Sequence, residues 1–215
     1  MGTTGRGKFI VIEGIDGAGT TTQAALLLDH LVSRDVRAHI TREPSNGPAG
    51  RMIREILAGR TRGGAPFDRR ALALLFAADR LDHITSEVEP MLASGVTIIS
   101  DRYTLSSIAY QSQDAPVSWI RSINRHAPIP DLYTFLDIPA KVGDERIGRT
   151  RSSRDIFEEI GFQERVAAAY RQALGSVPKS RLFIVDGTLP REEVFSAISR
   201  RVDRLKLGHP RRDNG

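Results

Sequence analysis

The chain has 215 residues, of which 40% are hydrophobic and 27% charged, and its formal net charge is +5. These proportions are those of an ordinary globular domain, and they exclude collagen-like, wholly disordered and disulfide-stapled proteins. The absence of cysteine also excludes a thiolate zinc site and a cysteine nucleophile, and it agrees with a reducing compartment. The longest apolar runs, such as 71–78, are too short to cross a bilayer. We therefore expect a cytoplasmic protein with no membrane partner.

Short strand-like runs alternate along the chain with longer segments of helical period. The first predicted strand covers 9–12, and a glycine-rich turn and a helix over about 20–33 follow it. Further strands are predicted at 36–41, 96–100, 132–136 and 182–185. Helices are predicted at about 49–57, 69–92, 105–111, 118–124, 141–147 and 157–174, and a last helix presents Val194, Ile198, Val202 and Leu205 on one face.

Apolar strands separated by helices predict a five-stranded parallel sheet in an α/β three-layer sandwich. No repeat or linker divides the sequence, so one domain is expected over 1–215, with its core at about 8–205. Within that domain we expect an arginine-rich lid at about 146–156 and a flexible tail at 206–215.

The turn after the first strand has the spacing of a phosphate-binding loop. Glycines at such a turn let successive N–H groups and a helix N-terminus face an anion. The match to the pattern G-x-x-x-x-G-K-[ST] predicts a nucleotide contact for the whole loop, and the alternative is an ordinary glycine-rich strand-to-helix turn. The predicted contacts are Gly14, Ile15, Asp16, Gly17, Ala18, Gly19, Thr20, Thr21 and Thr22.

One position of this loop departs from the pattern, because Thr20 stands where lysine is expected. That lysine normally neutralises charge on the β- and γ-phosphates, and threonine carries no charge. Thr21 keeps the hydroxyl position that usually holds Mg²⁺. Our hypothesis is that an arginine of the lid closes over the phosphates and supplies the charge. The candidates are Arg146, Arg149, Arg151 and Arg154.

Six ordered segments together resemble bacterial thymidylate kinase, the dTMP kinase family. They are FIVIEGIDGAGTTTQ (9–23), TREP (41–44), LLFAADR (74–80), DRYTLSSIAYQ (101–111), PDLYTFLD (130–137) and the arginine-rich segment before FEE (157–159). The resemblance implies the P-loop nucleoside monophosphate kinase fold and the reaction of ATP with dTMP to give ADP and dTDP, with Mg²⁺, in dTTP synthesis. It also implies a homodimer formed through helices.

The resemblance assigns the first substrate contacts. Asp16 would accept a hydrogen bond from the deoxyribose 3′-hydroxyl, although an aspartate in a loop also caps turns through its own side chain. Arg42 would hold the monophosphate of dTMP, and a surface ion pair is its competing use. TREP is followed by Ser45-Asn46-Gly47 rather than the family's usual Gly-Gly-Thr, which affects how Arg42 is presented.

Phe76 and Arg80 are four residues apart, so a helix places them on one face. The resemblance gives Phe76 the stacking contact with thymine and gives Arg80 a hydrogen bond to the thymine O4. Without the resemblance, a phenylalanine at this place would be assigned to the core.

Asp101 and Arg102 follow the third predicted strand, where ligands of parallel sheets collect. Asp101 suits Mg²⁺, and Arg102 suits a bridge between the donor and acceptor phosphates. A structural Asp–Arg pair is the alternative. By resemblance, Ser106, Tyr110 and Gln111 line the nucleoside, and the Tyr110 ring disfavours a ribose 2′-hydroxyl.

Three other functions stay open on the sequence alone. The chain could phosphorylate another nucleotide or nucleoside, or it could bind nucleotides with weak or lost catalysis because its loop lacks lysine. The high pI of about 9.9 suggests nucleic-acid binding as a third alternative, which we do not expect.

Overall fold

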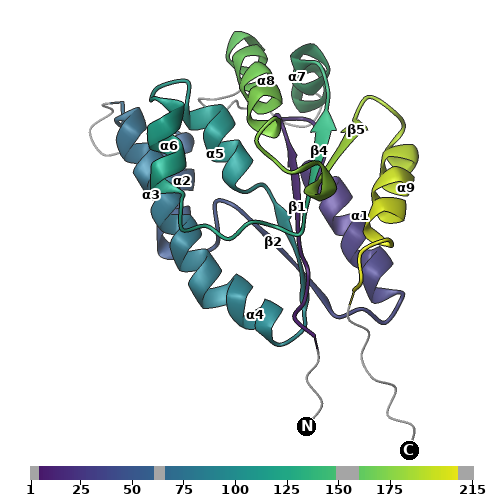
Figure 1. Ribbon diagram of the computed structural model, residues 1–215. Coiled ribbons are helices and arrows are strands. Elements are labelled where there is room, and N and C mark those ends of the chain that lie inside the picture. Colours follow the sequence, from purple (N-terminus) through teal and green to yellow (C-terminus); the bar gives the residue numbers. More distant parts are fainter. Residues whose placement is uncertain (1–4, 61–65, 149–159, 208–215) are drawn as a thin grey trace, which may run out of the picture.

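The computed structural model describes residues 5–60, 66–148 and 160–207. Its centre is a five-stranded sheet with the order β2-β3-β1-β4-β5, in which every pair of neighbours is parallel (Figure 1). This confirms the predicted α/β class and the five-stranded parallel sheet. The strands are β1 (Phe9–Gly14), β2 (Ala38–Arg42), β3 (Thr97–Asp101), β4 (Leu132–Asp137) and β5 (Leu182–Asp186).

Helices cover both faces of the sheet (Figure 1). On one side α1 (Thr20–Val32) packs against α9 (Arg191–Val202). On the other side lie α2 (Pro48–Leu57), α3 (Arg69–His83), α4 (Glu89–Ala93), α5 (Thr104–Gln111) and α6 (Val117–Ile123). The helices α7 (Ala140–Gly148) and α8 (Ile160–Leu174) lie near the carboxyl ends of the strands, with α8 packed against α5.

The predicted helix over 69–92 is interrupted. A π-helical turn at Ile84–Val88 separates α3 from α4. Pro90 has no amide hydrogen to donate, so the regular α-helical hydrogen bonding cannot run unbroken through this stretch. Elsewhere the differences are small: β2 starts two residues later than predicted, and α9 ends at Val202, before Leu205. Residues 157–159 of the predicted helix 157–174 lie outside the described residues, as does 208–215 of the predicted tail.

The strand register places the candidate residues. Asp101 at the end of β3 pairs with Arg42 of β2 on one side and with Ile12 of β1 on the other. The six residues of β1 are all buried, which anchors this strand in the middle of the core. The carboxyl ends of β2, β3 and β1 therefore meet at one edge of the sheet, directly below the glycine-rich loop.

Candidate nucleotide site

A cavity of about 720 Å³ opens at this edge of the sheet. Most of the predicted site residues line it: Asp16, Gly17, Ala18, Gly19, Thr20, Thr21, Thr22, Arg42, Phe76, Arg80, Asp101, Arg102, Ser106, Tyr110, Gln111 and Arg146. Two of the predicted loop contacts do not, because Gly14 is the last residue of β1 and Ile15 belongs to the hydrophobic core. Arg149, Arg151 and Arg154 lie outside the described residues.

The glycine-rich loop takes its shape from two glycines in the left-handed region. Gly17 has φ 77°, and a Cβ atom there would lie 2.3 Å from the Gly143 carbonyl oxygen of α7. Gly19 has φ 93° and immediately precedes α1. L-residues with a side chain rarely adopt this conformation, so glycine is required for the chain to turn from β1 into the helix. The N-terminus of α1 consequently faces the cavity, where its free N–H groups suit a phosphate.

Thr21 and Asp101 meet at the floor of the cavity. The Thr21 hydroxyl donates a hydrogen bond to Asp101 Oδ2, and Asp101 Oδ1 is buried with no hydrogen-bond partner among the described residues. The described residues contain no cluster of three or more aspartate, glutamate or histidine side chains that could hold a metal alone. One hydroxyl and one carboxylate fit Mg²⁺ bound together with nucleotide phosphates, because this ion takes few protein ligands.

Arg102 points back over the loop. Its Nη1 donates to the Gly14 carbonyl oxygen at 3.1 Å and to the Tyr110 hydroxyl at 3.3 Å, while its Nη2 forms an ion pair with Asp16. Its backbone has φ 72°, a conformation that costs a non-glycine residue about 1–3 kcal/mol. Burial alone would lower the pKa of the Arg102 guanidinium, but Tyr110 and Asp16 beside it raise that pKa well above its ordinary value. Arg102 is therefore a permanent cation.

Gln163 of α8 holds the Asp16 carboxylate from the other side. Its Nε2 donates to Asp16 Oδ2 at 2.8 Å, and its Oε1 accepts from the Asp16 backbone N–H at 3.3 Å. Sequence reasoning missed Gln163, since 147 residues separate it from its partner and a lone glutamine in a helix carries no signal. The Asp16 side chain is thus held by Gln163 of α8 and by Arg102, the residue that follows β3.

Arg80 is one of the most buried side chains, at 1% exposure. Its Nε donates to Glu43 Oε2 at 2.8 Å, and its Nη2 donates to Ser107 Oγ at 3.0 Å. Further bonds reach the Asn124 side chain and the Tyr103 carbonyl oxygen. Most donors of this guanidinium are therefore engaged by the protein, and the predicted contact with thymine O4 stays a prediction.

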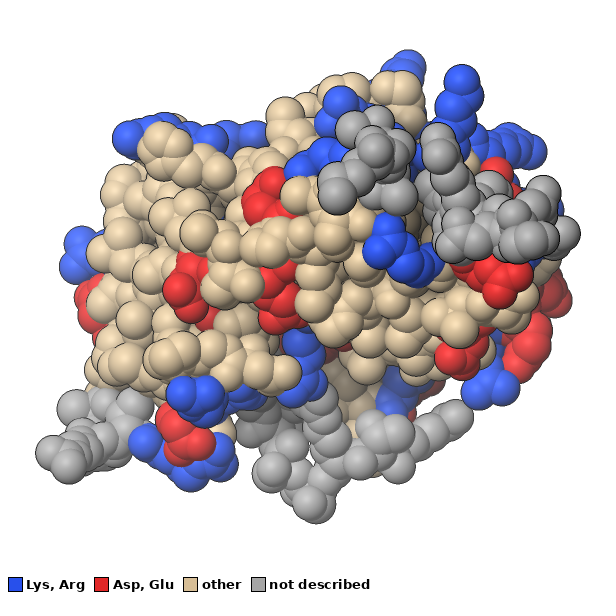
Figure 2. All heavy atoms as spheres, turned by 90° about the horizontal axis from the view of Figure 1, so that it is seen from below, with Lys and Arg blue, Asp and Glu red and all other residues tan. Residues whose placement is uncertain are grey.

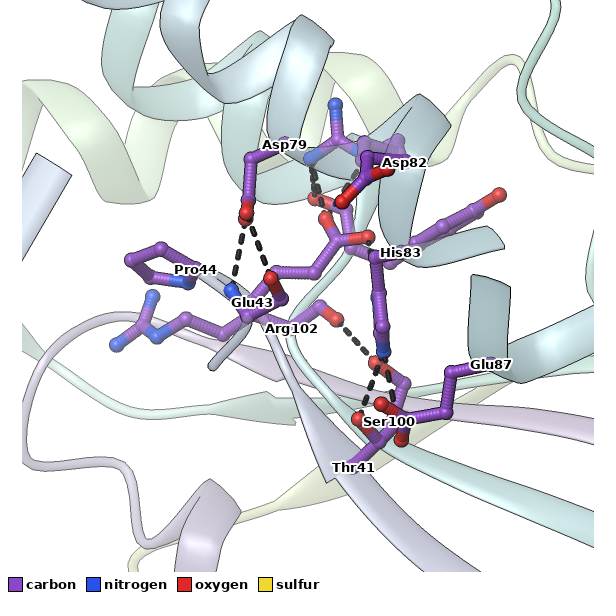
Figure 3. A network of polar contacts seen from close by, with 12 residues as sticks. Thr41, Glu43, Pro44, Asp79, Asp82, His83, Glu87, Ser100 and Arg102 are labelled. Atoms are coloured by element: carbon purple, nitrogen blue, oxygen red, sulfur yellow. Dashed lines mark hydrogen bonds and ion pairs between the residues drawn. The ribbon is translucent and has the colours of Figure 1, made fainter. Parts of the chain in front are cut away.

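His83 extends this network toward the sheet, lying between Glu43 and Thr41 (Figure 3). Its Nε2 is 2.7 Å from Thr41 Oγ1, and its Nδ1 is 3.5 Å from Glu43 Oε1. Burial alone would lower the pKa of the His83 imidazole, but the hydrogen bond and the charge of Glu43 raise it above the ordinary value of 6.5. Glu43 is therefore shared between two partners, Arg80 and His83.

The family model for thymidylate kinase matches residues 12–198 of the chain. The chain belongs to the thymidylate kinase family. It is 41% identical over 199 residues to a probable thymidylate kinase of Methanococcus maripaludis, covering 89% of this chain and 92% of the relative. It is 36% identical to a probable thymidylate kinase of Pyrococcus horikoshii, covering 94% and 99% of the two chains. It is 39% identical to one of Thermococcus kodakarensis, covering 81% and 87%.

These comparisons confirm the predicted family and its kinase fold, and members of the thymidylate kinase family are phosphotransferases. The assignment to the bacterial type stays a prediction. Among the described residues, no helix has the length and apolar character needed to span a membrane.

The departure from the thymidylate kinase pattern after TREP has a structural explanation. The Ser45 backbone N–H and hydroxyl both donate to the Asp79 carboxylate, at 2.7 and 2.6 Å. Arg54 of α2 donates to the carbonyl oxygens of Pro44 and Ser45, at 3.0 and 2.6 Å. The turn after Arg42 is thus held by side chains. Arg54 also lines the cavity.

Ser106 is held beneath the cavity by a buried carboxylate that sequence reasoning missed. The Ser106 hydroxyl donates to Glu13 Oε2 at 2.6 Å and lies 2.7 Å from the Tyr170 hydroxyl. Burial raises the pKa of Glu13 above its ordinary value, against the opposing effect of these hydrogen bonds. The sequence did offer a signal for this contact, because Glu13 is an acidic residue in the otherwise apolar strand Phe9–Gly14. Ser107, the neighbour that contacts Arg80, was missed as well.

The remaining predicted contacts, Phe76 and Gln111, also line the cavity. Phe76 is half-buried. It packs against the hydrophobic core and also lines the cavity, so a core role and a ligand contact are compatible for this residue. Gln111 is 6% exposed, and its Oε1 has no hydrogen-bond partner among the described residues. A buried acceptor without a partner favours a ligand that donates a hydrogen bond there.

Proposed function

We propose that this protein transfers the γ-phosphoryl group of ATP to dTMP, giving ADP and dTDP for dTTP synthesis. The observation that carries the proposal is the single cavity that joins the glycine-rich loop to Phe76 and Gln111 and is also lined by Arg42 and Arg102. Its volume of about 720 Å³ lies in the range of small-molecule sites. One end suits a triphosphate and the other suits a base.

On the donor side, residues 16–22 would hold the ATP phosphates through backbone N–H groups at the start of α1. Thr21 and Asp101 would hold Mg²⁺, and the free Asp101 Oδ1 supports that assignment. When bound, Mg²⁺ neutralises charge on the transferring phosphoryl group. Arg146 donates to the Gly17 and Gly187 carbonyl oxygens, which places it beside the loop and supports a donor-side contact.

On the acceptor side, Phe76 would stack on thymine, and Gln111 Oε1 would accept the hydrogen of thymine N3. Asp16 would bind the 3′-hydroxyl, and Tyr110 would pack against the sugar carbon that carries a hydroxyl in ribonucleotides. Arg42 is exposed at the end of β2, and its side chain makes no hydrogen bond or ion pair with the described residues. Its guanidinium is therefore available to the dTMP phosphate.

The chemistry requires position and charge more than proton transfer. The dTMP phosphate is already an anion, so its oxygen attacks without a general base. Arg42 and Arg102 would align this oxygen with the γ-phosphorus and stabilise the charge that spreads over the transferring group. Buried side chains such as Arg80 and Glu43 would keep the base end rigid.

A coupled turnover assay tests the proposal. ADP formation is followed with ATP, Mg²⁺ and, in separate reactions, dTMP, dUMP, UMP or thymidine. We expect dTMP to give the highest kcat/KM. A higher value for another acceptor would identify a kinase for that substrate. Binding of both nucleotides without turnover would identify a nucleotide-binding protein, the alternative that Thr20 favours.

We also propose that the protein forms a homodimer through α3. Leu74 and Leu81 are seven residues apart, hence on one face of this helix, and are 50% and 39% exposed. Met52, on the neighbouring α2, is 48% exposed. Sedimentation analysis of the wild type and of Leu74→Glu tests this, with a dimer expected only for the wild type.

A nucleic-acid partner receives no support from the surface seen in Figure 2. On that face, basic and acidic side chains are interspersed. Ion pairs such as Arg6–Glu89, at 2.8 Å, use part of the positive charge.

We propose a cytoplasmic location, where ATP and dTMP are available, and cell fractionation tests it.

A further inference from the structure

We propose that Asn124, the residue that caps the end of α6, sets the base selectivity of the cavity by positioning Arg80. This rests on the proposed function, in which Arg80 lies beside the acceptor base. Arg80 lines the cavity, whereas Asn124 does not. An effect of Asn124 on a bound base must therefore pass through the Arg80 guanidinium, which makes Asn124 a positioning residue.

The first observation is how the five N–H donors of Arg80 are used. Nε donates to Glu43, and Nη2 donates to Ser107 Oγ and to the Tyr103 carbonyl oxygen. Nη1 carries two hydrogens, and its one hydrogen bond with the described residues goes to Asn124 Oδ1. The second Nη1 hydrogen is therefore the donor that is left for a ligand in the cavity.

The second observation is how Glu43 holds the other edge of the guanidinium. A single oxygen, Glu43 Oε2, lies 2.8 Å from Nε and 2.6 Å from Nη2 of Arg80. The Tyr103 ring packs against the guanidinium, with Arg80 Cζ 5.2 Å from the ring centroid. The ring keeps the guanidinium in its plane, but one oxygen on one edge lets it pivot within that plane. The bond to Asn124 is on the opposite side, at Nη1, and it prevents this rotation.

The third observation is that the Asn124 amide has a fixed orientation. Its Nδ2 donates to the Ile120 carbonyl oxygen at 2.8 Å, in the last turn of α6. The amide oxygen is consequently the atom that is left for Arg80, because the opposite orientation would set an N–H group against the guanidinium. The C-terminus of α6 thus fixes where the remaining N–H of Arg80 points.

This fixed donor shares the cavity with an acceptor, the Gln111 Oε1 atom, which has no partner among the described residues. Thymine offers the complementary groups, an oxygen at position 4 beside an N–H at position 3. Cytosine carries an amino group at position 4, so two donors would face each other at Arg80. A guanidinium that cannot rotate rejects this amino group, and one that can rotate accommodates it.

The experiment compares dTMP with 5-methyl-dCMP, which differ only at positions 3 and 4 of the base. The ratio of their kcat/KM values is measured for the wild type, Asn124→Ala and Asn124→Asp. The aspartate keeps an oxygen for Arg80 and loses the bond to Ile120, whereas the alanine loses both. Gln113→Ala is the matched control, since Gln113 Nε2 donates to the Ala109 carbonyl oxygen at 2.9 Å and Gln113 does not line the cavity.

Asn124→Ala should lower the preference for dTMP at least about tenfold, which is the cost of one misplaced hydrogen bond from a charged group. Asn124→Asp and Gln113→Ala should keep the wild-type preference. An unchanged preference in Asn124→Ala would overturn the proposal. An equal loss in Asn124→Ala and Asn124→Asp would overturn it as well, because the bond to Ile120 would then be the important one.

A binding measurement separates this inference from the proposed function. Calorimetry with dTMP and with 5-methyl-dCMP, without ATP, gives the same comparison as a ratio of affinities, so it tests Asn124 even if dTMP is not phosphorylated. A wild type that binds the two nucleotides equally overturns the inference alone, and one that binds neither overturns both proposals. Thermal unfolding checks each variant. Asn124→Ser, whose hydroxyl oxygen is one bond closer to the backbone, replaces Asn124→Ala should that variant not fold.

Discussion

Two Asp/Glu–Arg pairs of this protein have the same chemistry and different surroundings. The Glu43–Arg80 pair has side chains that are 3% and 2% exposed, and His83, Ser107 and Asn124 complete its hydrogen bonds. The Asp16–Arg102 pair is 24% and 21% exposed and lines the cavity beside Asp101, whose Oδ1 has no partner among the described residues. Both pairs line the cavity, but the first has almost no solvent exposure and makes its hydrogen bonds with the protein, so it serves stability. The second keeps its charges within reach of a ligand.

The largest effect is expected on stability when the closed pair is broken. Glu43→Ala leaves the Arg80 guanidinium buried without its counter-charge, and such losses cost about 3–5 kcal/mol. Chemical denaturation should show this as a lower midpoint. Glu55→Ala is the matched control, because the side chains of Glu55 and its partner Arg60 are 55% and 62% exposed, and this variant should leave the midpoint unchanged. Equal midpoints for the two variants would contradict a larger stabilising role for the buried Glu43–Arg80 pair.

The next largest effect is expected on catalysis at the open end. Asp101→Asn removes the carboxylate next to Thr21, and kcat should fall about 10²–10³-fold, as expected for a lost charge-stabilising group. The Mg²⁺ concentration for half-maximal activity should rise as well. Asp137→Asn provides the control at the end of β4, where Asp137 pairs with Arg171 at 2.8 Å and does not line the cavity. Similar losses in both variants would show that the effect is not specific to the site.

A smaller stability effect is expected when the open pair is weakened. Asp16→Asn keeps a side-chain oxygen for Gln163 and lies near solvent, so we expect a loss of about 1 kcal/mol in unfolding free energy. The KM for dTMP should rise, and 3′-deoxy-dTMP should lose less affinity than dTMP. A stability loss as large as that of Glu43→Ala would remove the contrast between the pairs.

The smallest effect is a pH dependence that belongs to the closed network. His83 faces Thr41, Glu43, Glu87 and Asp79, and its pKa in the folded protein is raised above 6.5. Its contribution to stability is therefore fully present below pH 6.5 and is lost as pH rises through the folded pKa. His83→Gln should flatten the stability curve in that window, whereas exposed His126→Gln should not. An unchanged slope in His83→Gln would show that His83 does not titrate as described.

The sequence was sufficient to predict the sheet, because buried strands and amphipathic helices have distinct periods. It also predicted the loop, Arg42 and Asp101, since each follows the end of a strand and parallel strands end at one edge. The contacts of Glu43 with Arg80 and of Gln163 with Asp16 could not be predicted. They join residues 37 and 147 positions apart, and only the packing of the helices on the sheet brings them together.

The most direct test of the account is the affinity of one molecule that contains both nucleotides. Adenosine and thymidine joined through a 5′,5′-pentaphosphate should fill the whole cavity, since it connects the loop to Phe76 and Gln111. Because the two halves are linked, we expect this compound to bind at least about 10²-fold tighter than dTMP or the β,γ-imido analogue of ATP alone. Binding no tighter than that of the better single nucleotide would contradict a cavity in which donor and acceptor meet end to end.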